Sequence, residues 1–142
     1  MTFKLDTEIQ LSPDSDKTYY ISSAHRNDVT KDKSRWIISM GEEVECFIES
    51  QEEEWIESNL SWGIRSNGNG LECIGFSTQD DELKFAKFID SSKNNKWHGY
   101  PADYIRRQQD RPGIPVLKIW REKNIILKHH IIKIRQGKAC NL

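Results

Sequence analysis

The chain of 142 residues lacks any apolar run near the roughly 20 residues needed to cross a bilayer, so no membrane-spanning helix is expected. Its three cysteines, Cys46, Cys73 and Cys140, are far apart and form no C-x-x-C pair, the spacing typical of zinc and dithiol redox sites. We therefore expect reduced thiols and neither a metal nor a cofactor. The N-terminal segment MTFKLDTEIQL contains acids and no continuous apolar stretch, which is unlike a secretory or transit signal and predicts a cytoplasmic protein.

Motifs of common enzyme chemistry are also missing. The sequence contains no glycine-rich phosphate loop, no G-x-S-x-G and no H-E-x-x-H. A pair of histidines beside a basic residue is enough for a metal-independent ribonuclease. One imidazole takes the proton from the attacking hydroxyl, and the other protonates the leaving oxygen. The adjacent His129 and His130, however, would point about 100 degrees apart on a helix. We expect a non-enzymatic protein, with ribonuclease activity as the lesser alternative.

A strong overall charge is lacking as well, since 21 Lys and Arg stand against 22 Asp and Glu. The two signs are nevertheless separated along the chain. Residues 1–91 hold 9 basic and 19 acidic side chains, while residues 92–142 hold 12 basic and 3 acidic ones. This separation predicts either two oppositely charged faces or two segments that neutralise each other on folding.

In the acidic segment, apolar residues mostly recur at every second position, which is typical of strands with one buried face. Strands are predicted at 3–11 and 19–22, with a polar loop over 23–34. Two hairpins are predicted over 36–48 and 60–75, the second around the turn sequence SNGNG. The first hairpin would carry a strongly acidic outer surface.

Helical signals are fewer in this segment. Ser50 and Glu53 have the spacing of a capping box and predict a short helix over 50–60. Thr78 and Asp81 mark a second helix start, and the apolar residues that follow, up to residue 89, would cover one face of the sheet.

The basic segment favours helices after a polar linker at 91–95. A first helix is predicted from Pro101 through Ile105, a second over 116–124, and a third from Leu127 to Gly137.

The predicted class is therefore α+β, with an antiparallel sheet of about five strands and a covering helix, followed by about three short C-terminal helices. We expect a single domain over 1–142, in which 1–91 is acidic and sheet-rich and 92–142 is basic and helical.

The first functional hypothesis concerns the acidic residues, because eight glutamates fall within the 16 positions from Glu42 to Glu57. A dense negative patch speeds association with cationic proteins and can imitate a phosphate backbone. We therefore expect a macromolecule-binding protein, in its most concrete form a small bacterial immunity protein that neutralises a basic toxin such as a nuclease. The alternative is that these glutamates form a solvent-exposed face with no binding function. The candidate partner-binding residues are Glu43, Glu45, Glu49, Glu52, Glu53, Glu54, Trp55 and Glu57.

The second hypothesis is a nucleic-acid-binding module in the basic segment, where two predicted helices are joined by a short connection much as in a helix-turn-helix. The many isoleucines of the last helix argue against this hypothesis. They indicate a helix that is largely packed against the rest of the protein, whereas a helix that reads a DNA groove needs an exposed polar face. The candidate nucleic-acid-binding residues are Arg106, Arg107, Arg121, Lys128, Lys133 and Arg135.

The segment Trp97, His98, Gly99, Tyr100 and Pro101 is the most unusual local cluster. Its aromatics could stack on a base or could clamp the helices onto the sheet. We favour the clamp. The sequence leaves open whether the sheet and the helices share one core.

Overall fold

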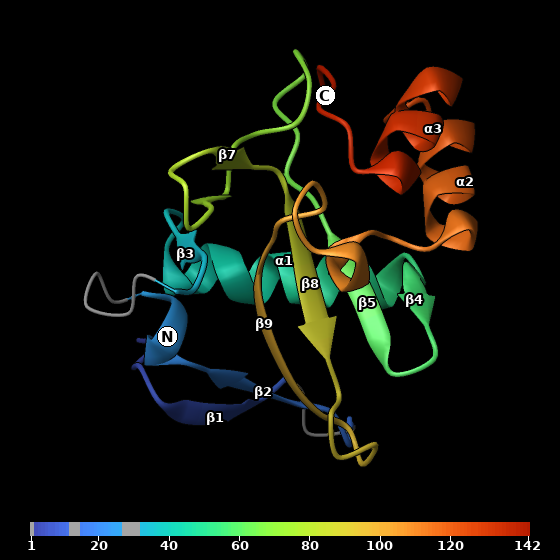
Figure 1. Cartoon of the computed structure of the whole chain (residues 1–142). Coiled ribbons are helices and arrows are strands. Elements are labelled where there is room, and N and C mark those ends of the chain that lie inside the picture. The colour runs from blue at the N-terminus through green and yellow to red at the C-terminus, as the bar shows by residue number, and fades with distance from the viewer. Residues whose placement is uncertain (1, 12–14, 27–31) are drawn as a thin grey trace.

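A computed structural model of the chain describes residues 2–11, 15–26 and 32–142 and has a mixed α+β fold (Figure 1). The α-helices are α1 (Met40–Glu52), α2 (Ile114–Glu122) and α3 (Lys128–Gln136), with short 3-10 helices η1 (Ser23–His25) and η2 (Gln108–Asp110). The strands are β1 (Thr7–Gln10), β2 (Thr18–Ile21), β3 (Arg35–Trp36), β4 (Ile56–Glu57), β5 (Leu60–Gly63), β6 (Gly75–Phe76), β7 (Glu82–Leu83), β8 (Phe85–Ile89) and β9 (Lys96–Ala102).

The main sheet has six strands in the order β1-β2-β9-β8-β5-β4. Its neighbours are antiparallel except β2 and β9, which pair in parallel at Lys96 and Trp97 of β9. The longest strand, β9, pairs with β8 along its length, and this register places Tyr100 opposite Lys87. A smaller sheet has the order β3-β6-β7. The α+β class is thus confirmed, with more strands than predicted.

One face of the main sheet packs against α1, which crosses behind β8 and β9 in Figure 1. Phe47 of α1 lies 5.3 Å from Phe88 and 5.5 Å from Trp97, measured between ring centroids. Gly99 permits this packing, because a Cβ at that position would lie 2.3 Å from Phe88.

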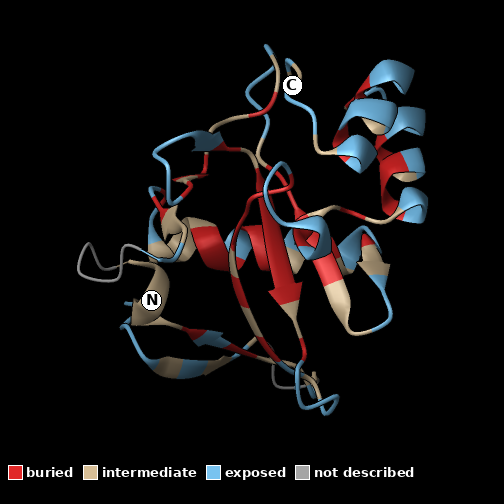
Figure 2. Cartoon of the chain, in the orientation of Figure 1, coloured by how far each residue is buried: buried red, intermediate tan, exposed pale blue. Residues whose placement is uncertain are grey.

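The opposite face packs against the C-terminal helices through Trp62, Phe85 and Trp120 (Figure 2). The Phe85 and Trp120 rings are 5.4 Å apart. The sheet and α2 and α3 therefore share a hydrophobic core, and a second core lies under α1.

The predicted hairpin over 36–48 is wrong, because α1 begins at Met40 and runs through this segment. The predicted helix over 50–60 is wrong as well, because α1 ends at Glu52 and β4 follows. Ser39 is its N-cap, and the side chain of Glu42 accepts from the Ser39 backbone N–H while the Ser39 hydroxyl accepts from Glu42 N–H. Val44, Cys46 and Ile48 suggest a period of two, yet the buried positions Val44 and Phe47 follow helical spacing. The capping box that forms is therefore the earlier one, at Ser39.

The predicted helix over 78–89 is wrong as well, since this segment forms β7 and β8. Residues Phe85 to Phe88 are all buried, because both faces of β8 are covered. A short apolar run of this kind cannot be told from a helix by periodicity.

The helix predicted from Pro101 is also wrong, because Pro101 and Ala102 end β9 and a turn follows. Proline is tolerated there because β2 pairs with β9 only at Lys96 and Trp97, well before Pro101.

Several other predictions are confirmed. Strands form within 3–11, 19–22 and 60–64, and the C-terminal helices over 116–124 and 127–136 appear as α2 and α3. The turn at SNGNG is closed by a bridge between Ser66 and Leu71, but the predicted hairpin over 60–75 is wrong, because β5 pairs with β4 and β8 while β6 pairs with β3 and β7 in the smaller sheet. Residues 27–31 of the predicted polar loop lie outside the described residues.

Candidate functional site

The predicted acidic residues lie on α1, at its C-terminal end and on β4. Glu45, Glu49, Glu52, Glu53 and Glu57 are exposed, and so is Glu54 in the turn that follows the helix. Because α1 is a helix and not a hairpin, Glu45, Glu49 and Glu53, which are spaced four residues apart, lie on one face of the helix.

Glu43 does not belong to this surface, because it is only 1% exposed. Its carboxylate accepts a hydrogen bond from the Tyr19 hydroxyl at 2.5 Å and pairs with Arg26 at 2.7 Å. Burial raises the pKa of Glu43, and the bonds from Tyr19 and Arg26 oppose that rise. Glu43 therefore ties β2 and η1 to α1 and is unavailable to a partner.

Trp55 is likewise buried, at 3% exposure, and its ring meets Trp120 edge-on at 5.7 Å between centroids. It packs the end of α1 against α2. Trp55 therefore belongs to the hydrophobic core and does not lie on the exposed acidic surface.

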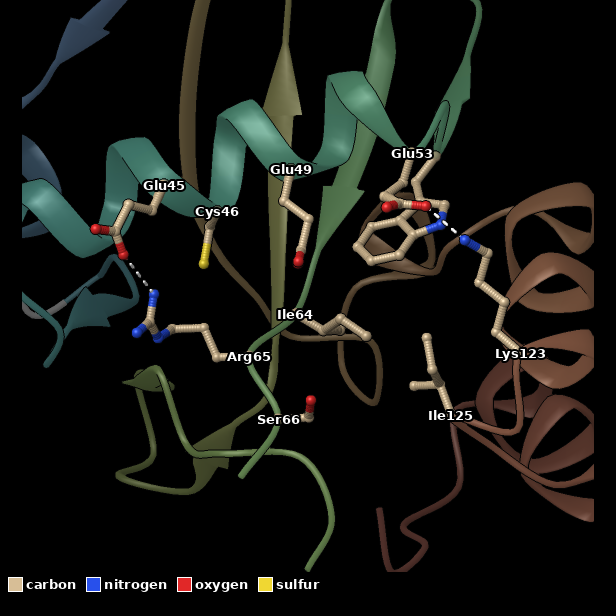
Figure 3. A pocket seen from close by; sticks show the side chains of 10 residues that line it. Glu45, Cys46, Glu49, Glu53, Ile64, Arg65, Ser66, Lys123 and Ile125 are labelled. Carbon is tan, nitrogen blue, oxygen red and sulfur yellow. Dashed lines mark hydrogen bonds and ion pairs between the residues drawn. The ribbon is translucent and has the colours of Figure 1, made fainter. Parts of the chain in front are cut away.

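A cavity of about 410 Å³ opens beside the exposed face of α1 (Figure 3). Glu45, Glu49 and Glu53 reach into it from the helix, while Ile64 and Ile125 form an apolar wall. The remaining lining residues are Cys46, Trp55, Arg65, Ser66 and Lys123. The cavity thus joins α1, the end of β5 and the connection between α2 and α3, which are distant in the sequence.

Two cations close the ends of this cavity. Arg65 pairs with Glu45 at 3.2 Å and with Glu42 at 3.3 Å, and Lys123 pairs with Glu53 at 2.5 Å. The Glu49 carboxylate, between them, makes no ion pair or hydrogen bond with the described residues. Burial raises the pKa of Glu49 and the charge of Glu53 raises it further, while the charges of Arg65 and Lys123 oppose that rise. The centre of the cavity is therefore a carboxylate that has cations nearby but no direct partner among the described residues.

The predicted nucleic-acid-binding residues come from three parts of the basic segment. Arg106 and Arg107 lie before η2, Arg121 lies on α2, and the others lie on α3. Arg106 is engaged by Asp81 and by Asp103. The side chain of Arg135 donates to the Pro112 carbonyl, while Arg121, Lys128 and Lys133 are exposed.

The histidines of α3 have a structural role. His130 is 8% exposed, and its Nδ1 accepts from the Leu127 backbone N–H at 3.0 Å, which caps the helix. The His129 ring lies 4.2 Å from that of His130, between centroids, so the two rings are closer than the helical spacing alone suggests. One of the two imidazoles is nevertheless committed to the helix start.

Sequence reasoning missed a buried polar cluster on the sheet face opposite α1. Asp110, 1% exposed, accepts from the Tyr100 hydroxyl at 2.6 Å and from the Asp103 backbone N–H at 2.9 Å. Lys87, on β8, has its Nζ 3.7 Å from the Asp110 carboxylate and also donates to the Gln109 carbonyl. Burial lowers the pKa of Lys87, and Asp110 opposes that shift. The cluster fastens η2 to the sheet.

Two neighbouring strands, one with Lys87 and one with Tyr100, would have pointed to this cluster, but the prediction of a helix over 78–89 concealed the first of them. The alternation along β9 places the residues of the segment from Trp97 to Pro101 on two different faces. Trp97 and Gly99 face α1 and pack, whereas Tyr100 faces the buried polar cluster.

Among the described ranges, no group of three His, Cys, Asp or Glu side chains is placed to hold a metal ion. No helix in the described part of the chain is long and apolar enough to cross a membrane. Comparisons of the chain with family models, with curated proteins and with solved structures find no match.

Proposed function

We propose that the chain is a binding protein that uses the exposed acidic face of α1 to dock a cationic protein. The observation that carries this proposal is the position of Glu49, a carboxylate with no direct ion pair among the described residues that points into an open cavity. A carboxylate in that position is well placed to receive a guanidinium or ammonium group.

The surroundings of Glu49 support the same reading. Glu45 and Glu53 flank it on the same helix face, and exposed Glu52, Glu54 and Glu57 extend the negative surface beyond the helix end. A surface of one sign steers an oppositely charged partner during diffusion and raises its association rate.

The concrete form of this function is neutralisation of a basic toxin, such as a nuclease domain, in a bacterial cytoplasm. A nuclease binds the phosphate backbone through basic residues, and an acidic helix face can occupy those residues in place of the nucleic acid. The nucleic-acid-binding alternative in the basic segment has less support, because Arg106 is paired with Asp81 and Asp103 and the side chain of Arg135 donates to a backbone carbonyl.

The test is a charge reversal at Glu49, Glu52 and Glu53, each changed to lysine, in the full chain. A partner captured from the native cells should associate with the variant about tenfold more slowly or worse at low salt. The difference should shrink above about 0.1 M salt, where the Debye length falls to about 10 Å. Association rates by stopped-flow or surface binding measure this directly.

The matched control reverses three exposed acids elsewhere, Glu8, Asp16 and Glu122, which changes the net charge by the same amount. An unchanged association rate in the α1 variant, or an equal loss in the control, contradicts the docking face. The toxin form makes a separate prediction: the captured partner is toxic when expressed alone and harmless when co-expressed with the wild-type chain.

A further inference from the structure

A second surface, distinct from the acidic face, surrounds the ring of Tyr100 on the opposite side of the sheet. The His25 ring stacks on the Tyr100 ring, with centroids 5.2 Å apart and planes inclined by 17°. The Arg107 guanidinium lies 5.8 Å from the centroid of the same ring. His98 shares this side of β9, because it is two positions before Tyr100. We call His25, Lys33, His98, Tyr100 and Arg107 the Tyr100 face.

The imidazole of His25 has a defined orientation. Its Nδ1 lies 2.9 Å from the Ser34 carbonyl oxygen, which can only accept, so Nδ1 carries the proton and Nε2 is the acceptor. Among the described residues, no group hydrogen-bonds this Nε2. Burial lowers the pKa of His25, the Ser34 carbonyl opposes that shift, and the charges of Lys33, His98 and Arg107 lower it further.

Three acids, Asp32, Asp103 and Asp110, line a small pocket together with Arg107. The Asp110 carboxylate accepts from the Tyr100 hydroxyl and lies 3.7 Å from the Nζ of Lys87 and from the Nε of Arg107. The Arg107 guanidinium is nevertheless half exposed, and Lys33 is exposed. The Tyr100 face therefore combines a stacked aromatic pair with two cations that solvent can reach.

Stacked aromatic rings bordered by cations are the means by which proteins hold single nucleotides and single-stranded nucleic acid, since the rings take the base and the cations take the phosphate. We propose that the Tyr100 face binds a nucleotide unit, with its base against the His25 ring and its phosphate at Arg107 and Lys33. The nucleotide comes either from a free mononucleotide or from single-stranded RNA. Lys87 and Asp110 act beneath this face as positioning residues, because they hold the Tyr100 hydroxyl and the η2 segment in place.

Binding of a fluorescent oligoadenylate RNA of about eight nucleotides, a length within the range that one domain covers, tests the proposal at low salt. Adenosine monophosphate and inorganic phosphate serve as competitors. Arg107→Gln, Lys33→Gln and His25→Gln should each weaken binding of the RNA or the mononucleotide about tenfold or more. Matched controls are Arg121→Gln and His129→Gln, which remove the same groups from exposed positions on α2 and α3.

The competitors distinguish the two sources. Displacement by the mononucleotide at concentrations similar to the RNA identifies a free nucleotide, whereas displacement by RNA alone identifies a single strand. Equal competition by inorganic phosphate overturns the proposal, because the ring pair then contributes nothing. The absence of binding at millimolar concentration, or equal losses in the two controls, also overturns it.

Thermal unfolding of each variant separates lost binding from lost folding. Arg107 and Lys33 are exposed side chains, so their variants decide the outcome even where His25→Gln lowers the unfolding temperature.

Discussion

Replacing Asp110 with asparagine should destabilise the protein by about 3–5 kcal/mol, because it removes the counter-charge of a buried lysine. Lys87 is only 4% exposed and has its Nζ 3.7 Å from the Asp110 carboxylate. The variant can respond by releasing the lysine proton on folding. At pH 7 that release costs about 1.36 kcal/mol for each pH unit below the ordinary lysine pKa of 10.5, or about 5 kcal/mol. The loss of unfolding free energy therefore falls in the same range whether Lys87 stays charged or releases its proton.

The assays are urea unfolding, which gives the free energy, and thermal unfolding of four proteins: wild type, Asp110→Asn, Lys87→Met and the double variant. Asp110→Asn should lower the unfolding temperature by roughly 10–20 °C, given about 3–4 °C for each kcal/mol in a domain of this size. The double variant should be more stable than Asp110→Asn alone, since no charge is then stranded in the interior.

The pH dependence supplies an independent check. In Asp110→Asn the folded chain holds Lys87 with a lowered pKa, so stability is greatest above the unfolded value of 10.5 and is lost as pH falls. The gap to wild type should therefore narrow as pH rises from about 7 to about 9, at up to 1.4 kcal/mol per unit. A loss below about 1 kcal/mol, or a double variant as unstable as the single one, refutes the reasoning.

Two further predictions concern the pair β8 and β9. Gly99→Ala should cost about 1–3 kcal/mol in urea unfolding, because the new Cβ would lie 2.3 Å from the buried ring of Phe88; an unchanged midpoint contradicts this. Asp90→Ala should also destabilise by about 1–3 kcal/mol, because the Asp90 carboxylate accepts from backbone N–H groups of the β8–β9 turn, the shortest at 2.8 Å from Asn95. Burial opposes ionisation of Asp90, but these bonds lower its pKa below 3.8, so the deficit of Asp90→Ala should be full near pH 6 and should shrink as pH falls through the folded pKa. A deficit that is the same at about pH 6 and about pH 3 contradicts that assignment.

Local signals sufficed where the chain ends a helix or turns sharply. Gly137, at φ 71°, terminates α3 where a glycine was expected, and Pro115 lies in the first turn of α2. These features depend on a few neighbouring residues, so sequence reasoning located them.

The wrong helix over 78–89 arose because both faces of the central strands are covered. α1 packs on one face and α2 on the other, so β8 shows no alternation of apolar and polar residues. At α1 a helix was mistaken for strands, because Val44, Cys46 and Ile48 alternate by chance on a helix whose acidic residues face solvent. The Ser39 capping box was the local signal that would have identified it.

The sequence identified the acidic segment that contains the candidate site, but it did not show which of its residues are exposed. Six of its eight residues are exposed, as a surface site requires, whereas Glu43 and Trp55 are buried by contacts with Tyr19, Arg26 and Trp120. Each of those contacts joins segments far apart in the chain.

The α+β class, the separation of charge at residue 91 and the two C-terminal helices could be predicted, because they follow from composition and from interactions a few residues long. Long-range packing sets which glutamates share a cavity and which aromatic and basic residues meet at Tyr100, and no local pattern encodes it. The charge boundary itself falls in the turn between β8 and β9, inside the main sheet. Lys87 from the acidic segment and Asp110 from the basic one therefore pair against the overall trend, since burial selects a partner by proximity in the fold and not by position in the sequence.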